Sequence, residues 1–97
     1  MNEVSDPGSF RERSVPPSME RRVIVIEPGG RRPYDETEWL GALVVVESGQ
    51  VDLETTDGGR QRFDTGAMLW LEGLPLSGLR AHGPGPAVLV AISRRPS

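Results

Sequence analysis

Residues 39–72 constrain the fold of this chain most strongly, because short apolar runs alternate there with turn-forming residues. The run 43–46 is apolar and mostly β-branched, and 51–55 alternates apolar and acidic side chains with the period of a half-buried strand. The Asp-Gly-Gly at 57–59 favours a tight hairpin, since these residues accept the positive φ that such turns need. A second turn at 64–66 precedes another apolar run. The stretch therefore predicts the middle of a small β-barrel.

Unbroken apolar runs at 23–26 and 87–92 predict further strands that are covered on both faces. Glu-Pro-Gly-Gly follows the first run and Gly-Pro-Gly-Pro precedes the second, and Trp39 is expected to open the central strand after a polar loop at 31–38. No segment predicts a helix of about ten residues or more. The spacing of strands and turns predicts an all-β fold, either a sandwich or a closed barrel.

The beginning of the chain differs from the rest in composition. Residues 1–20 carry several Pro and Ser and few apolar residues, so we expect a flexible tail, with Phe10 either part of it or an anchor on the barrel or on a partner. Residues 21–95 are expected to form the barrel as a single domain, because the whole chain has only 97 residues.

Charge argues against nucleic-acid binding. The formal net charge is −3 at pH 7, and both signs are mixed along the chain, whereas nucleic-acid binders favour a basic stripe. All 11 basic residues are Arg. This usage indicates a GC-rich genome or selection for carboxylate and phosphate recognition, and we favour the first interpretation.

The expected compartment follows from what the sequence lacks. Without Cys there are no disulfides, thiolate metal ligands or Cys nucleophiles. The N-terminal residues are polar and do not resemble a signal peptide, and no run approaches the ~18 apolar residues of a membrane span. We therefore expect a cytoplasmic protein that does not bind membranes.

Two stretches resemble the cupin superfamily. One is Pro-Gly-Gly at 28–30 followed by 44–59, which is similar to the cupin strand, glycine turn, strand and hairpin; the other is 64–81, with a glycine turn and a return strand. The resemblance covers 23–92 and implies a small cupin-like barrel, also called a double-stranded β-helix or jelly roll.

The metal ligands of that family are absent from the matching positions. The residues that stand there are Asp35 and Thr37, or Glu36 and Glu38, for the two His of the first motif, Ala42 for its Glu, and Ser77 for the His of the second motif. Imidazole nitrogens favour iron, nickel and zinc, so the family's metal chemistries do not carry over to these residues. We expect no metal and no other cofactor, with a weak all-oxygen site for Mn²⁺, Mg²⁺ or Ca²⁺ as the alternative.

Four residues are candidates for acid–base catalysis. Glu36 and Glu38 lie in the loop that would rim the barrel, and a desolvated carboxylate there would have a raised pKa. Glu72 follows an apolar strand, at the end of the barrel where the resemblance places the ligand pocket. His82 is the single His of the chain. The alternative is that these groups are solvated loop and turn residues.

Five residues are candidates for ligand binding: Tyr34, Trp39, Trp70, Ser77 and Arg80. The aromatic side chains would form pocket walls, which in a small barrel overlap with its core. Arg80 would pair with an anionic group if it faced the lumen, and otherwise it is an outward strand residue.

These features favour a small-molecule-binding, cupin-like protein without the usual metal site, in an accessory or sensory role. The alternative is a cofactor-free isomerase, epimerase or cyclase that uses the barrel lumen as its active site. The apolar runs 23–26, 43–46 and 87–92 exceed what one face of a small barrel needs. We therefore expect a homodimer through a sheet face or edge.

Overall fold

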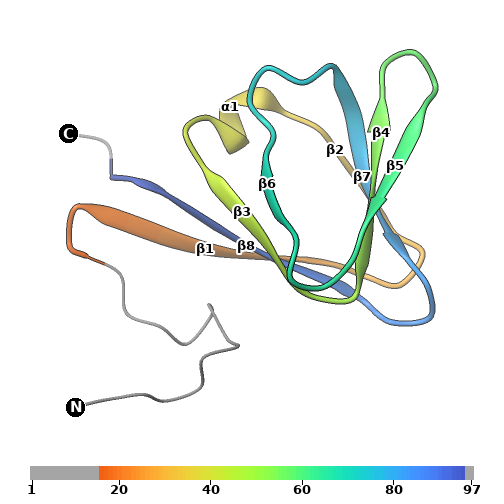
Figure 1. The fold of residues 1–97 in the computed structure, drawn as a ribbon, viewed down its shortest axis with the longest axis horizontal. Helices are drawn as coiled ribbons and strands as arrows, with labels where there is room; N and C mark the ends of the chain where they lie inside the picture. The colour runs from red at the N-terminus through yellow and green to blue at the C-terminus, as the bar shows by residue number, and fades with distance from the viewer. Residues whose placement is uncertain (1–15, 96–97) are drawn as a thin grey trace.

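The computed structural model describes residues 16–95, which form two antiparallel four-stranded sheets that face each other (Figure 1). Sheet A has the order β1 (Met19–Ile26), β8 (Ala87–Arg94), β3 (Leu43–Ser48) and β6 (Met68–Trp70). Sheet B has the order β2 (Arg31–Pro33), β7 (Leu76–His82), β4 (Gln50–Thr55) and β5 (Arg60–Phe63). The expected all-β fold is confirmed, and the two sheets are not closed into a barrel.

The strands pair in a nested order. β1 pairs with β8, β2 with β7, β3 with β6, and β4 with β5. Two more ladders, β3 with β8 and β4 with β7, complete the sheets. The outermost partners in the sequence are therefore neighbours in space, and the β4–β5 hairpin lies at the centre of the nesting.

Local turn chemistry explains two of the chain reversals. In the β4–β5 hairpin Gly58 has φ 91°, and the side chain of Asp57 accepts a hydrogen bond from the Gly59 amide at 3.1 Å. Gly49, with φ 80°, joins β3 to β4, and a Cβ there would lie 2.2 Å from the carbonyl oxygen of Pro86. Only glycine combines this backbone conformation with this close approach.

The core lies between the sheets and follows from strand alternation. Val51 and Leu53 of β4 point inward together with Leu79 of β7, and they meet Leu89 of β8 from the opposite sheet. The larger set of buried apolar residues comprises Ile24, Ile26, Trp39, Ala42, Val44, Val46, Val51, Leu53, Leu69, Leu71, Leu76, Leu79, Ala81, Ala87, Leu89 and Ala91. Apolar side chains thus fill the space between the sheets.

The expectation that Trp39 opens the central strand is wrong. Trp39 ends a short helix, α1 (Glu36–Trp39), and β3 begins only at Leu43. The side chain of Asp35 caps the helix by accepting from the Thr37 amide at 3.1 Å, and Gly41, with φ 66°, reverses the chain before β3. The indole is fully buried, so tertiary packing decides this element.

The polar segment 31–38 is also more ordered than a loop, because it contains β2 and most of α1. β2 forms only through its pairing with β7. Elements of three or four residues are too short to show the hydrophobic periodicity that predicts a strand or a helix, so the sequence alone does not predict them. In the part of the chain that the structure describes, no helix is long and apolar enough to cross a membrane.

The outward side of sheet A is apolar across all four strands. Val23, Val90, Val45 and Met68 lie opposite one another in a single row from β1 to β6. We call this side the apolar face; it also includes Val25, Val88 and Trp70. The apolar face explains the unbroken apolar runs, because the side chains of β1, β3 and β8 point alternately into the core and onto this face.

The expected tail at 1–20 lies largely outside the described residues, as does Phe10. β1 begins at Met19 and is paired along its whole length with β8, from Met19 opposite Arg94 to Ile26 opposite Ala87.

Candidate functional site

The outward side of sheet B carries charged side chains from all four of its strands. Alternation directs Asp52 and Glu54 outward, because their neighbours Val51 and Leu53 enter the core. The cross-strand registers bring basic residues beside them. We call this surface the arginine face; it consists of Arg31 of β2, Arg80 and His82 of β7, Asp52 and Glu54 of β4, and Arg60 and Arg62 of β5.

Asp52 is the buried centre of one half of the arginine face, with 1% of its surface exposed. Its Oδ1 accepts from Nε of Arg62 at 2.8 Å, and its Oδ2 accepts from Nη2 of the same guanidinium at 3.3 Å. Arg60 and His82 place nitrogens 3.8 and 3.9 Å from Oδ2. The hydrogen bond to Asp52 raises the pKa of Arg62 above its ordinary value.

Glu54 is the central carboxylate of the other half of the arginine face. Its Oε1 accepts from Nε of Arg31 at 2.7 Å, and its Oε2 accepts from Nε of Arg80 at 2.9 Å. These hydrogen bonds, that of Arg31 first, hold the pKa of Glu54 below its ordinary value. Arg31 also donates to the carbonyl oxygen of Ser77 at 3.0 Å, so its side chain crosses β7 to reach β4.

A second group of polar residues surrounds α1, at the end of the molecule where β6 leads into β7 (Figure 1). The hydroxyl of Tyr34 donates to the carbonyl oxygen of Leu71 at 3.2 Å. Burial first, and then the charges of Glu36, Glu72 and Asp35, raise the pKa of Tyr34. Glu72 accepts from the Gly41 amide at 2.9 Å, which fastens the β6–β7 connection to the end of α1.

Arginines cover the other side of α1. Arg32 forms an ion pair with Glu38, which raises the pKa of that guanidinium. Arg22 donates to the backbone carbonyl of Glu38 at 2.5 Å, and its guanidinium lies 5.7 Å from the ring centroid of Trp39. Among the described residues, the indole Nε1 of Trp39 has no hydrogen-bond partner.

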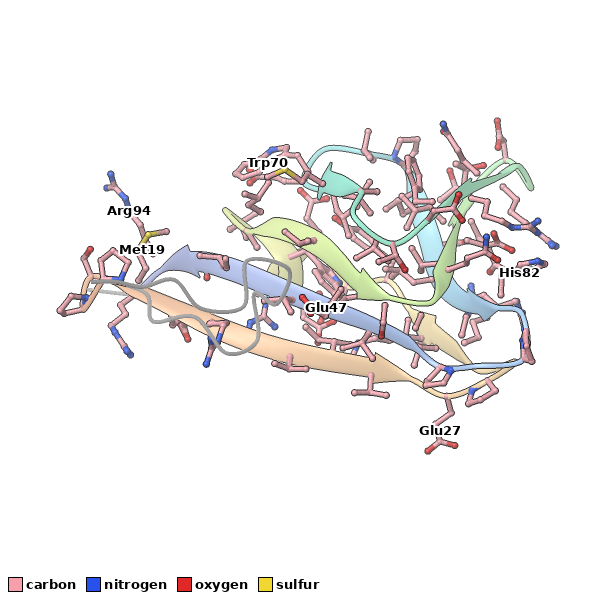
Figure 2. The ribbon with its side chains drawn as sticks, turned by 60° about the horizontal axis from the view of Figure 1, so that its bottom comes forward. Met19, Glu27, Glu47, Trp70, His82 and Arg94 are labelled. Carbon is pink, nitrogen blue, oxygen red and sulfur yellow. The ribbon has the colours of Figure 1, made fainter. Side chains whose placement is uncertain are left out.

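The structure divides the nine sequence-predicted site residues among three places. Ser77, Arg80 and His82 belong to the outward side of sheet B. Tyr34, Glu36, Glu38, Trp39 and Glu72 lie in or beside α1, and Trp70 is on the apolar face with 53% of its surface exposed. Figure 2 shows Trp70 and His82 far apart and directed away from each other. Within residues 16–95 no three His, Asp or Glu side chains are grouped so that they could hold a metal ion.

An open cleft lies where the chain passes from sheet A to sheet B, in the turn between β1 and β2. Its volume is about 390 Å³. It is lined by Val25, Ile26, Glu27, Gly30, Arg31, Arg32 and Pro33. Apolar residues and two arginines therefore border one depression, at a place where the sequence predicted a turn and a polar loop, and the guanidinium groups of these arginines bind Glu54 and Glu38.

Sequence reasoning missed most of the arginine face: Arg31, Arg60, Arg62, Asp52 and Glu54. Part of it was detectable from the hairpin. A three-residue loop at 56–58, with Gly58 at positive φ and the Thr55 amide donating to the Gly59 carbonyl, places Glu54 opposite Arg60 and Asp52 opposite Arg62, as observed. The opposite charges at these positions match across the strands. Nothing local indicates that Arg31 joins them, because it is 23 residues from Glu54 along the chain.

Comparison with known proteins identifies a relative in fold. Neither family models nor curated proteins gave a match. Among solved structures, the chain is similar to the crystal structure of protein NMB1881 from Neisseria meningitidis, with a TM-score of 0.59 and 14% sequence identity. The match covers 84% of this chain and 79% of that protein. At this identity the likeness shows a shared fold alone.

Proposed function

We propose that this chain is a small-molecule-binding protein of the cupin-like jelly-roll type, without the cupin metal site and in an accessory or sensory role. The observation that carries the proposal is the cleft between β1 and β2. Its volume of about 390 Å³ falls within the usual range of ligand sites. Apolar walls with a few convergent polar groups are also typical of such sites.

The lining of the cleft defines a ligand class. Val25, Ile26 and Pro33 offer an apolar wall, and Arg31 and Arg32, which already pair with Glu54 and Glu38, border the cleft with positive charge suited to a carboxylate. The matching ligand is a small organic acid with an apolar part.

Nested strand pairing supports the jelly-roll assignment. In an eight-stranded jelly roll a long hairpin is folded so that the first strand pairs with the last, and each inner pair follows the same rule. The pairings of β1 with β8, β2 with β7, β3 with β6 and β4 with β5 follow this order.

The positions of the acid–base candidates favour binding over catalysis. Glu72 and Glu38 are each engaged near α1, by the Gly41 amide and by Arg32. His82 faces Asp52 on the outward side of sheet B. A lumen isomerase or cyclase requires such groups around one cavity, whereas the space between these sheets is filled with apolar side chains.

A thermal-shift titration with small carboxylic acids, such as benzoate and hexanoate, and with their neutral amides tests the proposal. We expect the acids to raise Tm more than the amides. Val25→Phe should abolish this shift by filling the cleft. Val23→Phe is the matched control, because Val23 is similarly exposed on the same face of β1 and does not line the cleft.

Two results would contradict this function. One is the absence of any Tm shift with acids or amides. The other is an acid-induced shift that both phenylalanine variants retain. Chemical conversion of a bound acid, followed by NMR during the incubation, would support the isomerase or cyclase alternative instead.

The apolar face supports the expected homodimer, which we include in the proposal. The row from Val23 to Met68 crosses the whole of sheet A: Val23 and Met68 at its ends have about half of their surface exposed, as do Val25 and Trp70, whereas Val90 and Val45 between them are buried. Exposed apolar patches of this kind mark interaction sites. A two-fold axis through the patch would place the same row of the second copy against it.

A further inference from the structure

We infer that the arginine face is a docking surface for an acidic segment of another protein. This inference does not rest on the ligand of the cleft, although Arg31 borders both the cleft and the arginine face. It rests on the charge of the face, on the donors that its guanidinium groups retain, and on its shape.

Charge on this face has the opposite sign to that of the whole chain. Arg31, Arg60, Arg62 and Arg80 oppose Asp52 and Glu54, and Asp64 lies close enough to act on Arg62, which leaves a formal charge of +1 on a chain whose net charge is −3. A positive surface on an acidic protein favours a partner that presents negative charge locally.

The guanidinium groups keep most of their hydrogen-bonding capacity. Each has five N–H donors. Arg62 uses two of its nitrogens on Asp52, and Arg80 uses one on Glu54. Arg60 is 57% exposed in its side chain, and it approaches Asp52 only to 3.8 Å, beyond hydrogen-bonding distance. Donors therefore remain for a partner's carboxylates.

The two carboxylates prepare the surface for binding. Asp52 is buried and accepts hydrogen bonds from Arg62 through both of its carboxylate oxygens. Glu54 accepts one hydrogen bond from Arg31 and one from Arg80. Side chains that are already ordered lose less conformational entropy when a partner binds. This order distinguishes the arginine face from a set of freely moving surface arginines.

Shape and composition select the class of partner. The face is the surface of a four-stranded sheet, about 14 Å between its outer strands, and is broader than the concave sites of small anions. Its outward residues include no aromatic side chain on which a base could stack. An extended segment with several Asp or Glu residues meets these conditions.

The test uses the full chain and a dye-labelled hexaglutamate peptide, with binding followed by fluorescence anisotropy at low ionic strength. We expect saturable binding that added NaCl weakens, because exposed charge pairs are screened. Arg60→Gln should weaken it by about two- to fivefold, the range for an exposed ion pair. This variant leaves the hydrogen bonds of Asp52 to Arg62 in place, so the fold should persist.

Arg94→Gln is the matched control, since it removes the same charge from the exposed end of β8. Figure 2 places Arg94 at the opposite end of the molecule from His82, which belongs to the arginine face. Equal weakening by both variants, or no binding at low salt, would overturn the inference. So would displacement of the peptide by a hexathymidylate at the same or a lower concentration, which would assign the face to nucleic acid.

Discussion

At the scale of single residues, Gly78 of β7 leaves room for the ion pair between Arg31 of β2 and Glu54 of β4. The guanidinium of Arg31 passes over it on the way to Glu54, and a Cβ at this position would lie 2.5 Å from Nη2 of Arg31. The atom in the way is the end of a flexible side chain. An alanine would therefore displace Arg31 and leave the backbone of β7 in place.

A double-mutant cycle tests this link. Gly78→Ala should lower the free energy of unfolding by about 1 kcal/mol, because Arg31 loses its bonds to Glu54 and to the Ser77 carbonyl. In an Arg31→Ala background the same change should be close to neutral, since nothing is left to displace. Urea unfolding of the four proteins gives the coupling. Additive effects of the two changes would show that Gly78 serves another purpose.

At the scale of elements, β4 holds sheet B together on both of its sides. Its inward residues Val51 and Leu53 belong to the core, and its outward carboxylates each receive arginines from other strands. Glu54 alone connects β4 with both β2 and β7. The stability of the sheet should therefore depend on the charge of this one group.

Acid should remove that contribution. Because the folded pKa of Glu54 is lowered, its stabilising effect is complete above the ordinary glutamate range and disappears as pH falls through the folded pKa. When the pH is lowered from about 6 to about 3, the Tm of Glu54→Gln should therefore fall by less than the Tm of the wild type. The control is Glu27→Gln, a carboxylate that Figure 2 shows projecting from the turn after β1. A Glu54→Gln profile parallel to that of the wild type would contradict this role.

At the scale of the whole molecule, the two outward faces differ in chemistry. Sheet A presents the apolar face, and sheet B presents the arginine face. If two copies associate through the apolar face, both arginine faces point away from the interface. A dimer would then offer two docking surfaces, and a partner with two acidic segments would gain from their proximity.

Association of two copies is measured by size-exclusion chromatography with light scattering. We expect a dimer for the wild type and a monomer for Met68→Glu, because Met68 ends the apolar row and is 60% exposed. Leu40→Glu places the same charge at a residue 55% exposed just after α1, outside sheet A, and should stay dimeric. A monomeric wild type, or a loss of dimer with both variants, would argue against this interface.

The sequence by itself determined the all-β class, most of the strands and their turns. These features depend on local chemistry: alternation in 51–55, glycine at 58 and 59, and apolar runs long enough for a strand. The length of the loop in the structure, residues 56–58, then sets Asp52 opposite Arg62 across the hairpin. Even the surplus of apolar residues, which predicted an interaction face, was visible in the runs of β1, β3 and β8.

Only the tertiary structure decided which predicted site residues meet. Trp39 entered a helix and the core, Trp70 turned outward on sheet A, and the acid–base candidates separated between α1 and sheet B. The arginine face likewise depends on strands far apart in the sequence, since Arg31 and Arg80 reach Glu54 over 23 and 26 residues. The face that a strand residue occupies, and its neighbours there, depend on pairings that no local pattern specifies.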